Sequence, residues 1–282
     1  FLWRSEQTGW GHLNLVDEQG RARPLTSGNW VVRSLEQVDE ERGEVIFTAS
    51  GKEPGDPYNV HTYRVGLDGT GLKRLTDGTG MHRTAWGLED KYFVDTFSQV
   101  HVAPKHVLRS HDGKQVMTLE NADVSHLERE GWMPAEPFVA KGRDGTTDIF
   151  GVVIKPSFFD PNKSYPVIEN IYAGPHDNFV PKTFLGASRM HQLAELGFIV
   201  VQIDGMGTNN RGKAFHDVAW KNIADAGFPD RILWLQALAK QMPQADITRV
   251  GIYGTSAGGQ SSTGGVLFHP DFYDVAVSSC GC

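Results

Sequence analysis

A turn-and-strand unit recurs in the first part of this 282-residue chain. Three glycine-containing turns at residues 18–20, 68–70 and 112–114 each precede a segment with leucine and threonine. The leucines of these segments, Leu25, Leu75 and Leu119, lie 50 and 44 positions apart, which is about the period of a four-stranded propeller blade. Segments rich in β-branched and aromatic residues fill the intervals. We therefore expect residues 1–135 to form about two and a half to three blades of a β-propeller, because a β-sandwich would not explain the repeated unit.

The pattern changes after about residue 135. A turn at residues 143–145 separates two apolar segments and predicts a hairpin. Apolar strand segments then alternate with helical ones, which predicts an α/β domain with a mostly parallel sheet over residues 136–282. The expected strands are 138–141, 149–154, 165–172, 198–203 and 249–253, and the expected helices cover about 184–196 and the region around 232–238.

Composition and charge exclude several classes of protein. The net charge of -7 and the pI near 5.9 argue against a nucleic-acid binder, which would normally carry a basic face. The sequence contains no uninterrupted apolar run of the roughly 20 residues that a membrane span needs. Its two cysteines, Cys280 and Cys282, form no Cys-x-x-Cys pair and do not indicate a zinc site. We expect both to be buried thiols at the end of a strand.

Both ends of the sequence bear on its extent. The chain begins with Phe1 rather than methionine, and no signal-peptide pattern follows. Residues 274–280 have the composition of a strand that stops at its own end. We therefore expect this chain to be the middle of a longer protein.

Residues 254–259 read Gly-Thr-Ser-Ala-Gly-Gly, directly after the strand expected at 249–253. This is the Gly-x-Ser-x-Gly pattern of a nucleophile elbow, a strained strand-to-helix turn that needs small residues two places to either side of the serine. Such a turn exposes the Ser256 hydroxyl and aims the backbone N–H of Ala257 at the position where an oxyanion would form. The other interpretation is a glycine-rich turn that binds a phosphate at a helix N-terminus.

No cofactor or metal is predicted. A P-loop ends in Gly-Lys-Ser or Gly-Lys-Thr, whereas Gly259 is followed by Gln260. Residues 205–207 could open a dinucleotide fingerprint, but the position of its third glycine is Asn210. Three histidines spaced five residues apart match neither a helix face nor a strand face, and we expect surface or loop positions for them: His101, His106 and His111.

Two histidines near the motif are poor candidates for its general base. His176 precedes the serine, whereas the order of the triad in this fold is serine, acid, histidine. His269 lies 13 positions after Ser256. A helix of that length would carry it about 15 Å or more away from the serine. We therefore assign neither of them to the site.

The order of these segments resembles one family. Tyr165-Pro166 leads to Tyr-Ala-Gly-Pro at 172–175, then come Asp-Gly-Met-Gly-Thr at 204–208 and the elbow at Ser256. Over essentially its whole length the chain resembles the prolyl oligopeptidase family of serine peptidases, and within it the dipeptidyl peptidase IV branch. The resemblance implies the late, C-terminal blades of the propeller followed by the first part of an α/β-hydrolase domain.

The resemblance also implies roles for three residues. Ser256 matches the nucleophile, Tyr172 the tyrosine whose hydroxyl donates to the oxyanion, and Ala257 the residue whose backbone N–H is the other donor. A core tyrosine at a strand end is the alternative for Tyr172. The chain departs from the usual Trp-Ser-Tyr-Gly-Gly elbow, with Thr255 and Ala257 beside the serine, and has Met206 where relatives often carry arginine. These departures affect the subsites rather than the nucleophile.

The implied activity is that of a serine exopeptidase that releases Xaa-Pro or Xaa-Ala dipeptides from peptide N-termini. By resemblance, the acid and the histidine of the triad lie beyond Cys282, so we expect the chain alone to be inactive. The glutamates that hold the substrate amine would precede Phe1, and none is assigned here. A different hydrolase of the family (an acylaminoacyl peptidase, oligopeptidase or esterase) and a catalytically dead binding protein are the alternatives. Relatives are often homodimers and often secreted, periplasmic or membrane-anchored.

Overall fold

The computed structural model describes residues 1–281, which form two compact units. Unit 1 contains Phe1–Asp123 and two short later segments, Lys182–Phe184 and Asn210–Ala214. Unit 2 contains Val124–Pro181, Leu185–Asn209 and the chain from Phe215 onward. No helix within residues 1–281 has the length and apolar character needed to cross a bilayer.

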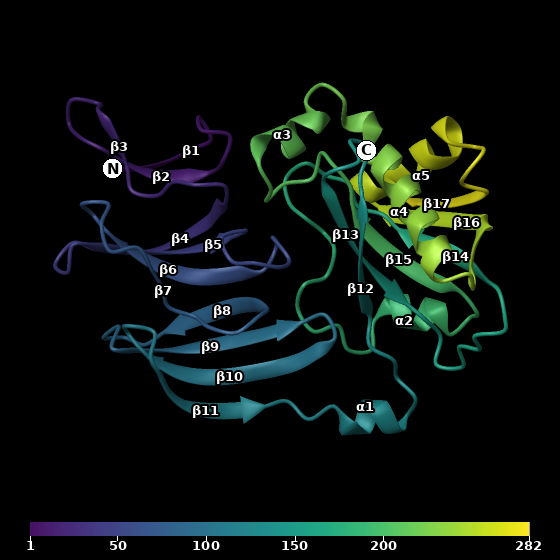
Figure 1. The fold of residues 1–282 in the computed structure, drawn as a ribbon, viewed down its shortest axis with the longest axis horizontal. Helices are drawn as coiled ribbons and strands as arrows, with labels where there is room; N and C mark the ends of the chain where they lie inside the picture. The colour runs from purple at the N-terminus through teal and green to yellow at the C-terminus, as the bar shows by residue number, and fades with distance from the viewer. Residues whose placement is uncertain (282) are drawn as a thin grey trace. The chain divides into compact units, whose positions relative to one another are not determined.

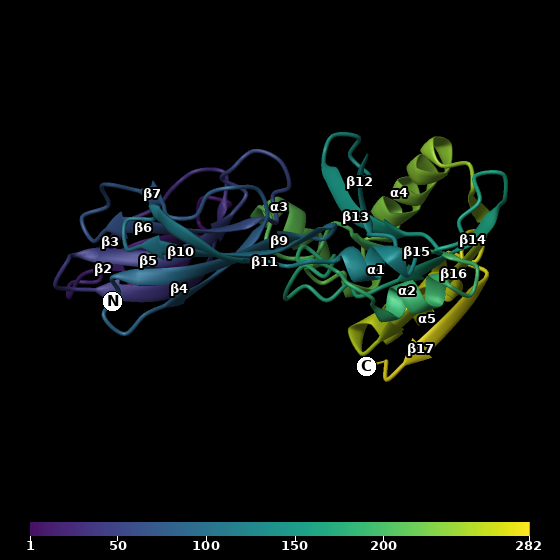
Figure 2. The ribbon, with the colours of Figure 1, turned by 90° about the horizontal axis from the view of Figure 1, so that it is seen from below.

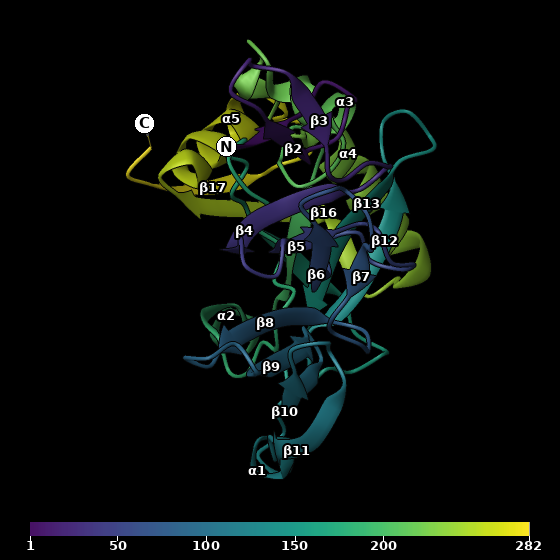
Figure 3. The same ribbon diagram turned by 90° about the vertical axis from the view of Figure 1, so that its left-hand side faces the viewer.

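Unit 1 consists of three antiparallel sheets that lie one beside the next (Figures 1 and 3). The first has three strands and the other two have four, each strand pairing with the next along the chain. This is the arrangement of consecutive propeller blades and confirms the expected fold class. The strands are β1 (Leu2–Ser5), β2 (His12–Val16), β3 (Ala22–Pro24), β4 (Val31–Asp39), β5 (Glu44–Ser50), β6 (Val60–Gly66), β7 (Lys73–Arg74), β8 (Met81–Trp86), β9 (Tyr92–Gln99), β10 (Val102–Ser110) and β11 (Gln115–Asn121).

The repeated Leu-Thr pair has the same structural role in two blades. Leu25 and Leu75 are both buried, with 4% and 2% of their surface exposed. The Thr26 hydroxyl accepts the backbone N–H of Leu13 at 3.0 Å and bonds a buried histidine, His12, at 3.0 Å. In the next blade the Thr76 hydroxyl does the same with the N–H of Thr62 and the ring of His61, each at 3.1 Å. The sequence repeat therefore encodes one apolar anchor and one hydroxyl that joins a blade's last segment to its neighbouring strand.

Unit 2 contains a six-stranded mixed sheet of order β12-β13-β15-β14-β16-β17. The strands β12 and β13 are an antiparallel hairpin, β13 pairs antiparallel with β15, and the remaining neighbours are parallel. Its strands are β12 (Glu136–Lys141), β13 (Asp148–Ile154), β14 (Tyr165–Asn170), β15 (Ile199–Asp204), β16 (Ala245–Thr255) and β17 (Val275–Ser279). Its helices are α1 (Ser125–Arg129), α2 (Arg189–Ala194), α4 (Phe228–Gln241) and α5 (Ala257–Phe268), with two short 3₁₀ turns (Asp217–Ala219 and Ile223–Asp225) before α4. The short helix α3 (Lys213–His216) begins in the last segment of unit 1 and ends in unit 2.

Helices cover both faces of this sheet. Successive residues of a strand point to opposite faces, and on β14 Glu169 bonds Arg231 of α4 while Asn170 contacts Met190 of α2. The two helices therefore lie on opposite sides of the sheet, as Figure 2 shows. The larger core lies on the α4 side, where Trp234 and Leu235 are fully buried against the sheet. A sheet covered on both sides explains why its central strands are almost continuously apolar.

Two expectations from the sequence are wrong in detail. The helix expected from about residue 184 begins only at Arg189, because the Ser188 side chain accepts the N–H of His191 and caps the helix there. Cys280 is exposed rather than buried: β17 is an edge strand that ends at Ser279, and the chain then turns away with a φ of 50° at Cys280. Cys282 lies outside the described residues.

Candidate active site

Ser256 lies in a strained turn between β16 and α5. The strand ends at Thr255, the helix begins at Ala257, and Ser256 between them has φ 58° and ψ -125°. A residue with a side chain rarely adopts this conformation, and where it does the site is commonly a functional one. The sequence places the serine in a Gly-x-Ser-x-Gly elbow, and the backbone has the strained geometry that such an elbow requires.

The glycines on both sides of Ser256 are required by close backbone contacts. A Cβ atom on Gly254 would lie 2.4 Å from the carbonyl oxygen of Gly258, and one on Gly258 would lie 2.2 Å from the carbonyl oxygen of Ile171. Backbone atoms cannot yield as a flexible side chain can, so neither position tolerates a side chain. The same contact brings the start of α5 against the end of β14: the Cβ position on Gly258 is 3.5 Å from the Cα of Tyr172.

The backbone N–H groups of Ser256 and Ala257 differ in their hydrogen bonding. The N–H of Ser256 donates to the Ser279 carbonyl of β17 at 2.9 Å. Ala257 is the first residue of α5, and the first N–H groups of a helix have no partner within the helix. The helix dipole adds partial positive charge at the same place. The N–H of Ala257 therefore has no partner within α5 and lies at the positive end of the helix, as a backbone donor to an oxyanion at Ser256 would have to.

Tyr172 follows β14 and is half-buried among aromatic side chains. The Phe179 ring lies 4.4 Å from its ring, centroid to centroid, at an angle of 42°, and the His176 ring contacts it edge-on at 5.8 Å. The loop that carries these rings is held to the segment after β15, since His216 Nε2 bonds the Pro175 carbonyl at 2.6 Å. Tyr172 thus belongs to a packed loop beside the elbow, rather than to the core beneath the sheet.

A buried ion pair connects the elements around the elbow. The fully buried Glu169 bonds Arg231 of α4 at 2.6 Å and accepts the Tyr273 hydroxyl at 2.7 Å, just before β17. Burial, together with the Glu169 carboxylate, raises the pKa of Tyr273 well above its ordinary value, so the phenol remains a donor. Breaking such a pair leaves one charge buried alone, which typically costs about 3–5 kcal/mol. The pair therefore holds β14, α4 and β17 together.

The histidines set aside in the sequence analysis have other surroundings. His269 ends α5 and packs against Phe228 at 4.8 Å between ring centroids. His106 bonds Thr96 at 2.9 Å on β10, and His111 bonds Glu44. Within residues 1–281 no three histidine, cysteine, aspartate or glutamate side chains converge as a metal site.

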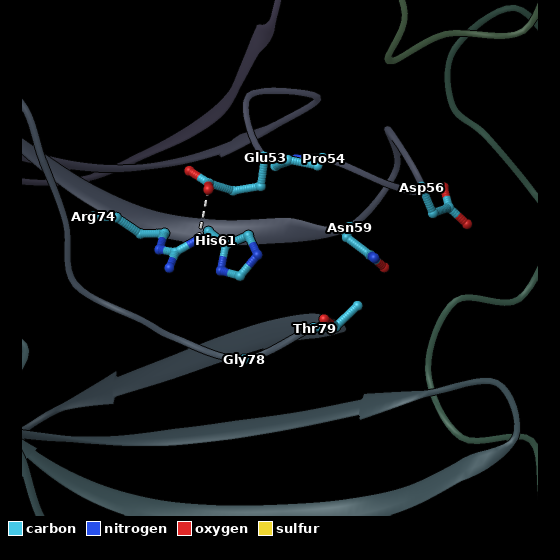
Figure 4. A pocket seen from close by; sticks show the side chains of 8 residues that line it. All are labelled: Glu53, Pro54, Asp56, Asn59, His61, Arg74, Gly78 and Thr79. Atoms are coloured by element: carbon cyan, nitrogen blue, oxygen red, sulfur yellow. Dashed lines mark ion pairs between the residues drawn. The ribbon is translucent and has the colours of Figure 1, made fainter.

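Unit 1 contains a separate polar hollow of about 320 Å³ (Figure 4). Glu53 pairs with Arg74 at 2.6 Å and accepts the Tyr63 hydroxyl at 2.8 Å. Asp56 pairs with Lys182 at 2.7 Å. Each charged side chain of the lining therefore has its counter-charge within unit 1, and we assign the hollow no part in the chemistry. Its lining residues are Glu53, Pro54, Asp56, Asn59, His61, Arg74, Gly78 and Thr79.

The histidine in this lining makes the stability of unit 1 depend on pH. Burial lowers the pKa of His61 to about 4, helped by the His82 ring 4.5 Å away. Below pH 6.5 the unfolded chain binds a proton that the folded chain does not bind until about pH 4, so the unfolding free energy falls by about 2–3 kcal/mol over that interval. Replacing His61 by glutamine should remove this part of the fall, as measured by urea denaturation at pH 7 and pH 4.5.

The matched control is His101→Gln, at an exposed turn position. Its loss of stability between the two pH values should equal that of the parent chain. Equal pH dependence in the His61→Gln chain and in the parent would show that His61 is not held neutral by its surroundings.

Comparisons with known proteins agree with this fold. Residues 1–104 match the dipeptidyl peptidase IV N-terminal region, and residues 185–282 match the prolyl oligopeptidase family. The later part of the chain is thus similar to the prolyl oligopeptidase family of serine peptidases, and the earlier part to the dipeptidyl peptidase IV branch of that family.

Individual relatives carry names from the same branch. The chain is 32% identical to a probable dipeptidyl-aminopeptidase B of Emericella nidulans over 89% of this chain and 28% of the relative. It is 30% identical to human dipeptidyl peptidase 8, over 90% of this chain and 29% of the relative. The chain thus spans less than a third of the length of these curated relatives.

Two solved structures have the same fold over almost the whole chain. A putative dipeptidyl aminopeptidase IV from Bacteroides ovatus superimposes with a TM-score of 0.85 at 26% identity, covering 99% of this chain and 42% of that structure. Porphyromonas gingivalis dipeptidyl peptidase 4 gives a TM-score of 0.83, also at 26% identity, covering 99% of this chain and 39% of that structure. The sheets of both units therefore have counterparts in experimentally determined peptidases.

Proposed function

We propose that the whole protein is a serine exopeptidase that releases Xaa-Pro and Xaa-Ala dipeptides from peptide N-termini. The observation that carries the proposal is the strained backbone of Ser256 at the start of α5, flanked by glycines that allow no side chain. The names of the similar proteins support a dipeptidyl peptidase over other serine hydrolases.

In this mechanism the Ser256 Oγ adds to the scissile carbonyl carbon and its proton passes to a histidine. We propose that this histidine and its acid come from chain beyond residue 282, so the present chain supplies the nucleophile and the donors. The carbonyl oxygen becomes an oxyanion, which accepts hydrogen bonds from the Ala257 N–H and the Tyr172 hydroxyl. The tetrahedral intermediate then collapses to an acyl-enzyme, and the amine leaves with the proton from the histidine. Water then hydrolyses the acyl-enzyme by the same steps and releases the dipeptide.

The test compares a free and a blocked amine. The whole protein should hydrolyse glycyl-prolyl-p-nitroanilide, and N-acetylation of the glycine should lower kcat/KM by at least about 30-fold, because a charged contact to the amine is lost. Equal hydrolysis of both substrates would replace the dipeptidyl assignment with an oligopeptidase or esterase, and preference for the acetylated one with an acylaminoacyl peptidase. If the protein is folded and hydrolyses neither substrate, the alternative of a catalytically dead binding protein would be favoured.

We also propose that the whole protein is a homodimer, by analogy with the family. Sedimentation equilibrium should give twice the mass of one chain. A single-chain mass at concentrations that support activity would contradict this.

A further inference from the structure

A buried carboxylate lies beneath the loop that carries Tyr172. Asp204 is the last residue of β15 and none of its surface is exposed. Its Oδ2 accepts the backbone N–H of Phe179 at 2.9 Å and that of Val180 at 2.8 Å, and its Oδ1 lies 3.0 Å from the Phe179 nitrogen. Hydrogen bonds to an ionised acceptor are about twice as strong as those between neutral groups. The carboxylate therefore fixes the backbone of the loop at Phe179.

The carbonyl group of Phe179 is also bound by a side chain of the sheet. Gln202 lies two residues before Asp204, on the same face of β15, and its Nε2 donates to the Phe179 carbonyl at 2.9 Å. The Gln202 Oε1 in turn accepts a hydrogen bond from Asn170 of β14 at 3.3 Å. Both backbone polar groups of Phe179 are thus bound by side chains of the sheet, which is unusual for a residue in a loop that can otherwise bond to water.

The side chain of Phe179 transmits this restraint to Tyr172. Its ring lies 4.4 Å from the Tyr172 ring, and the His176 ring contacts both edge-on, at 5.3 Å from Phe179. A packed aromatic wall limits the rotation of the tyrosine. A donor to an oxyanion must be held close to its productive position, because a displacement of about 1 Å can cost about 10²-fold in rate.

We propose that Asp204 is a positioning residue of this enzyme: it binds the backbone of Phe179 so that the Phe179 ring holds the Tyr172 phenol in place as an oxyanion donor. The inference rests on the proposed role of Tyr172. Asp204 itself touches no reacting atom and transfers no proton. Its effect on the reaction passes entirely through the tyrosine.

The kinetic test uses the whole protein and a double-mutant cycle. Asp204→Asn puts an amide NH₂ group beside the N–H donors of the loop, and should lower kcat about 10- to 100-fold with KM within about threefold. Tyr172→Phe removes the donor and should lower kcat about 10²- to 10³-fold. Because Asp204 acts through Tyr172, the double variant should be no more than about threefold slower than Tyr172→Phe alone. Losses that multiply in the double variant would overturn the proposal.

Phe179→Leu keeps the backbone hydrogen bonds to Asp204 and removes the aromatic wall. It should show the same selective loss of kcat even where Asp204→Asn destabilises the fold. An unchanged kcat in Phe179→Leu would show that the ring does not hold the tyrosine.

A measurement that does not depend on catalysis distinguishes this inference from the proposed function. Hydrogen exchange measured on the present chain should show the amides of Phe179 and Val180 protected, and Asp204→Asn should speed their exchange at least about 10-fold. The matched control is Asp230→Asn, an equally buried aspartate that bonds Arg143 and the Met206 N–H rather than the loop. It should leave those two amides unchanged. Unchanged exchange in Asp204→Asn would overturn the inference, whereas a wild-type protein that releases no dipeptide would overturn the proposed function alone.

Discussion

Replacing Ser256 by alanine is expected to lower kcat of the whole protein by about 10⁴- to 10⁶-fold. The variant loses the atom that forms the covalent bond, and the oxyanion donors that remain give only the residual rate that binding and electrostatics supply. Because Ser256 has the unfavourable φ of 58°, alanine meets the same backbone strain, and folding should change little. The measurement is hydrolysis of glycyl-prolyl-p-nitroanilide together with the thermal midpoint.

The control for this variant is Thr263→Ala. Thr263 is an exposed hydroxyl residue of the same helix and bonds only the Gly259 carbonyl one turn earlier. Its removal should leave kcat and KM within about twofold of the parent. A Ser256→Ala protein that retains more than about 1% of the parent kcat would mean that another group is the nucleophile.

The elbow could be predicted because its geometry is local. Five consecutive residues, Gly254 to Gly258, carry the pattern of the strained turn at Ser256, although the contacts that exclude side chains from the two glycines also involve the distant Ile171 carbonyl. The blades could be predicted for a similar reason, since a repeated Leu-Thr pair makes the same contacts in the first two blades, as Thr26 and Thr76 show. The alternation of strands and helices was sufficient to predict a mostly parallel sheet. In each case the sequence signal lies within one short segment or one repeat.

Contacts between segments that are distant in the sequence could not be predicted. Asp204 lies 24 and 25 positions from the amides that it binds, and it stands in the sequence as the polar end of an apolar strand. Glu169 and Tyr273 are separated by 104 positions. Composition alone does not indicate which of the 34 acidic residues are buried. A signal was present for Asp204, because a carboxylate at the C-terminal end of a buried parallel strand often faces the site.

The sequence pattern also did not predict where helices and strands begin and end. The apolar residues from about 184 onward suit a helix, but the Phe184 N–H donates to Ser98 in unit 1 at 2.9 Å, and the helix begins only after Ser188. A tertiary contact of this kind overrides local propensity. Cys280 was expected to be a buried thiol at the end of a strand, but β17 is an edge strand of the described sheet and the residue that follows it is exposed.

Replacing Gly258 by alanine is expected to lower the free energy of unfolding of unit 2 by about 3 kcal/mol or more and to abolish activity. The added Cβ would lie 2.2 Å from the Ile171 carbonyl oxygen, so the start of α5 and the end of β14 must separate. Overpacking in a well-packed site commonly costs about 1–3 kcal/mol. The cost should reach or exceed the upper end here, because the added Cβ meets a backbone carbonyl that cannot rotate away as a side chain can. The separation also moves the Ala257 N–H away from Tyr172. Urea denaturation and the rate of dipeptide release measure the two effects.

The matched control lies six residues further along the same helix. A Cβ on Gly264 would meet its nearest atoms, on Phe228 and Phe268, at 3.7 Å, which is ordinary contact distance. Gly264→Ala should therefore raise the free energy of unfolding by about 0.5–1 kcal/mol, because alanine favours a helix over glycine. A lower free energy of unfolding in Gly258→Ala and a higher one in Gly264→Ala would show that the close backbone approach at the elbow, rather than helix propensity, requires the glycine. A Gly258→Ala protein as stable and as active as the parent would mean that α5 does not pack against β14 in this way.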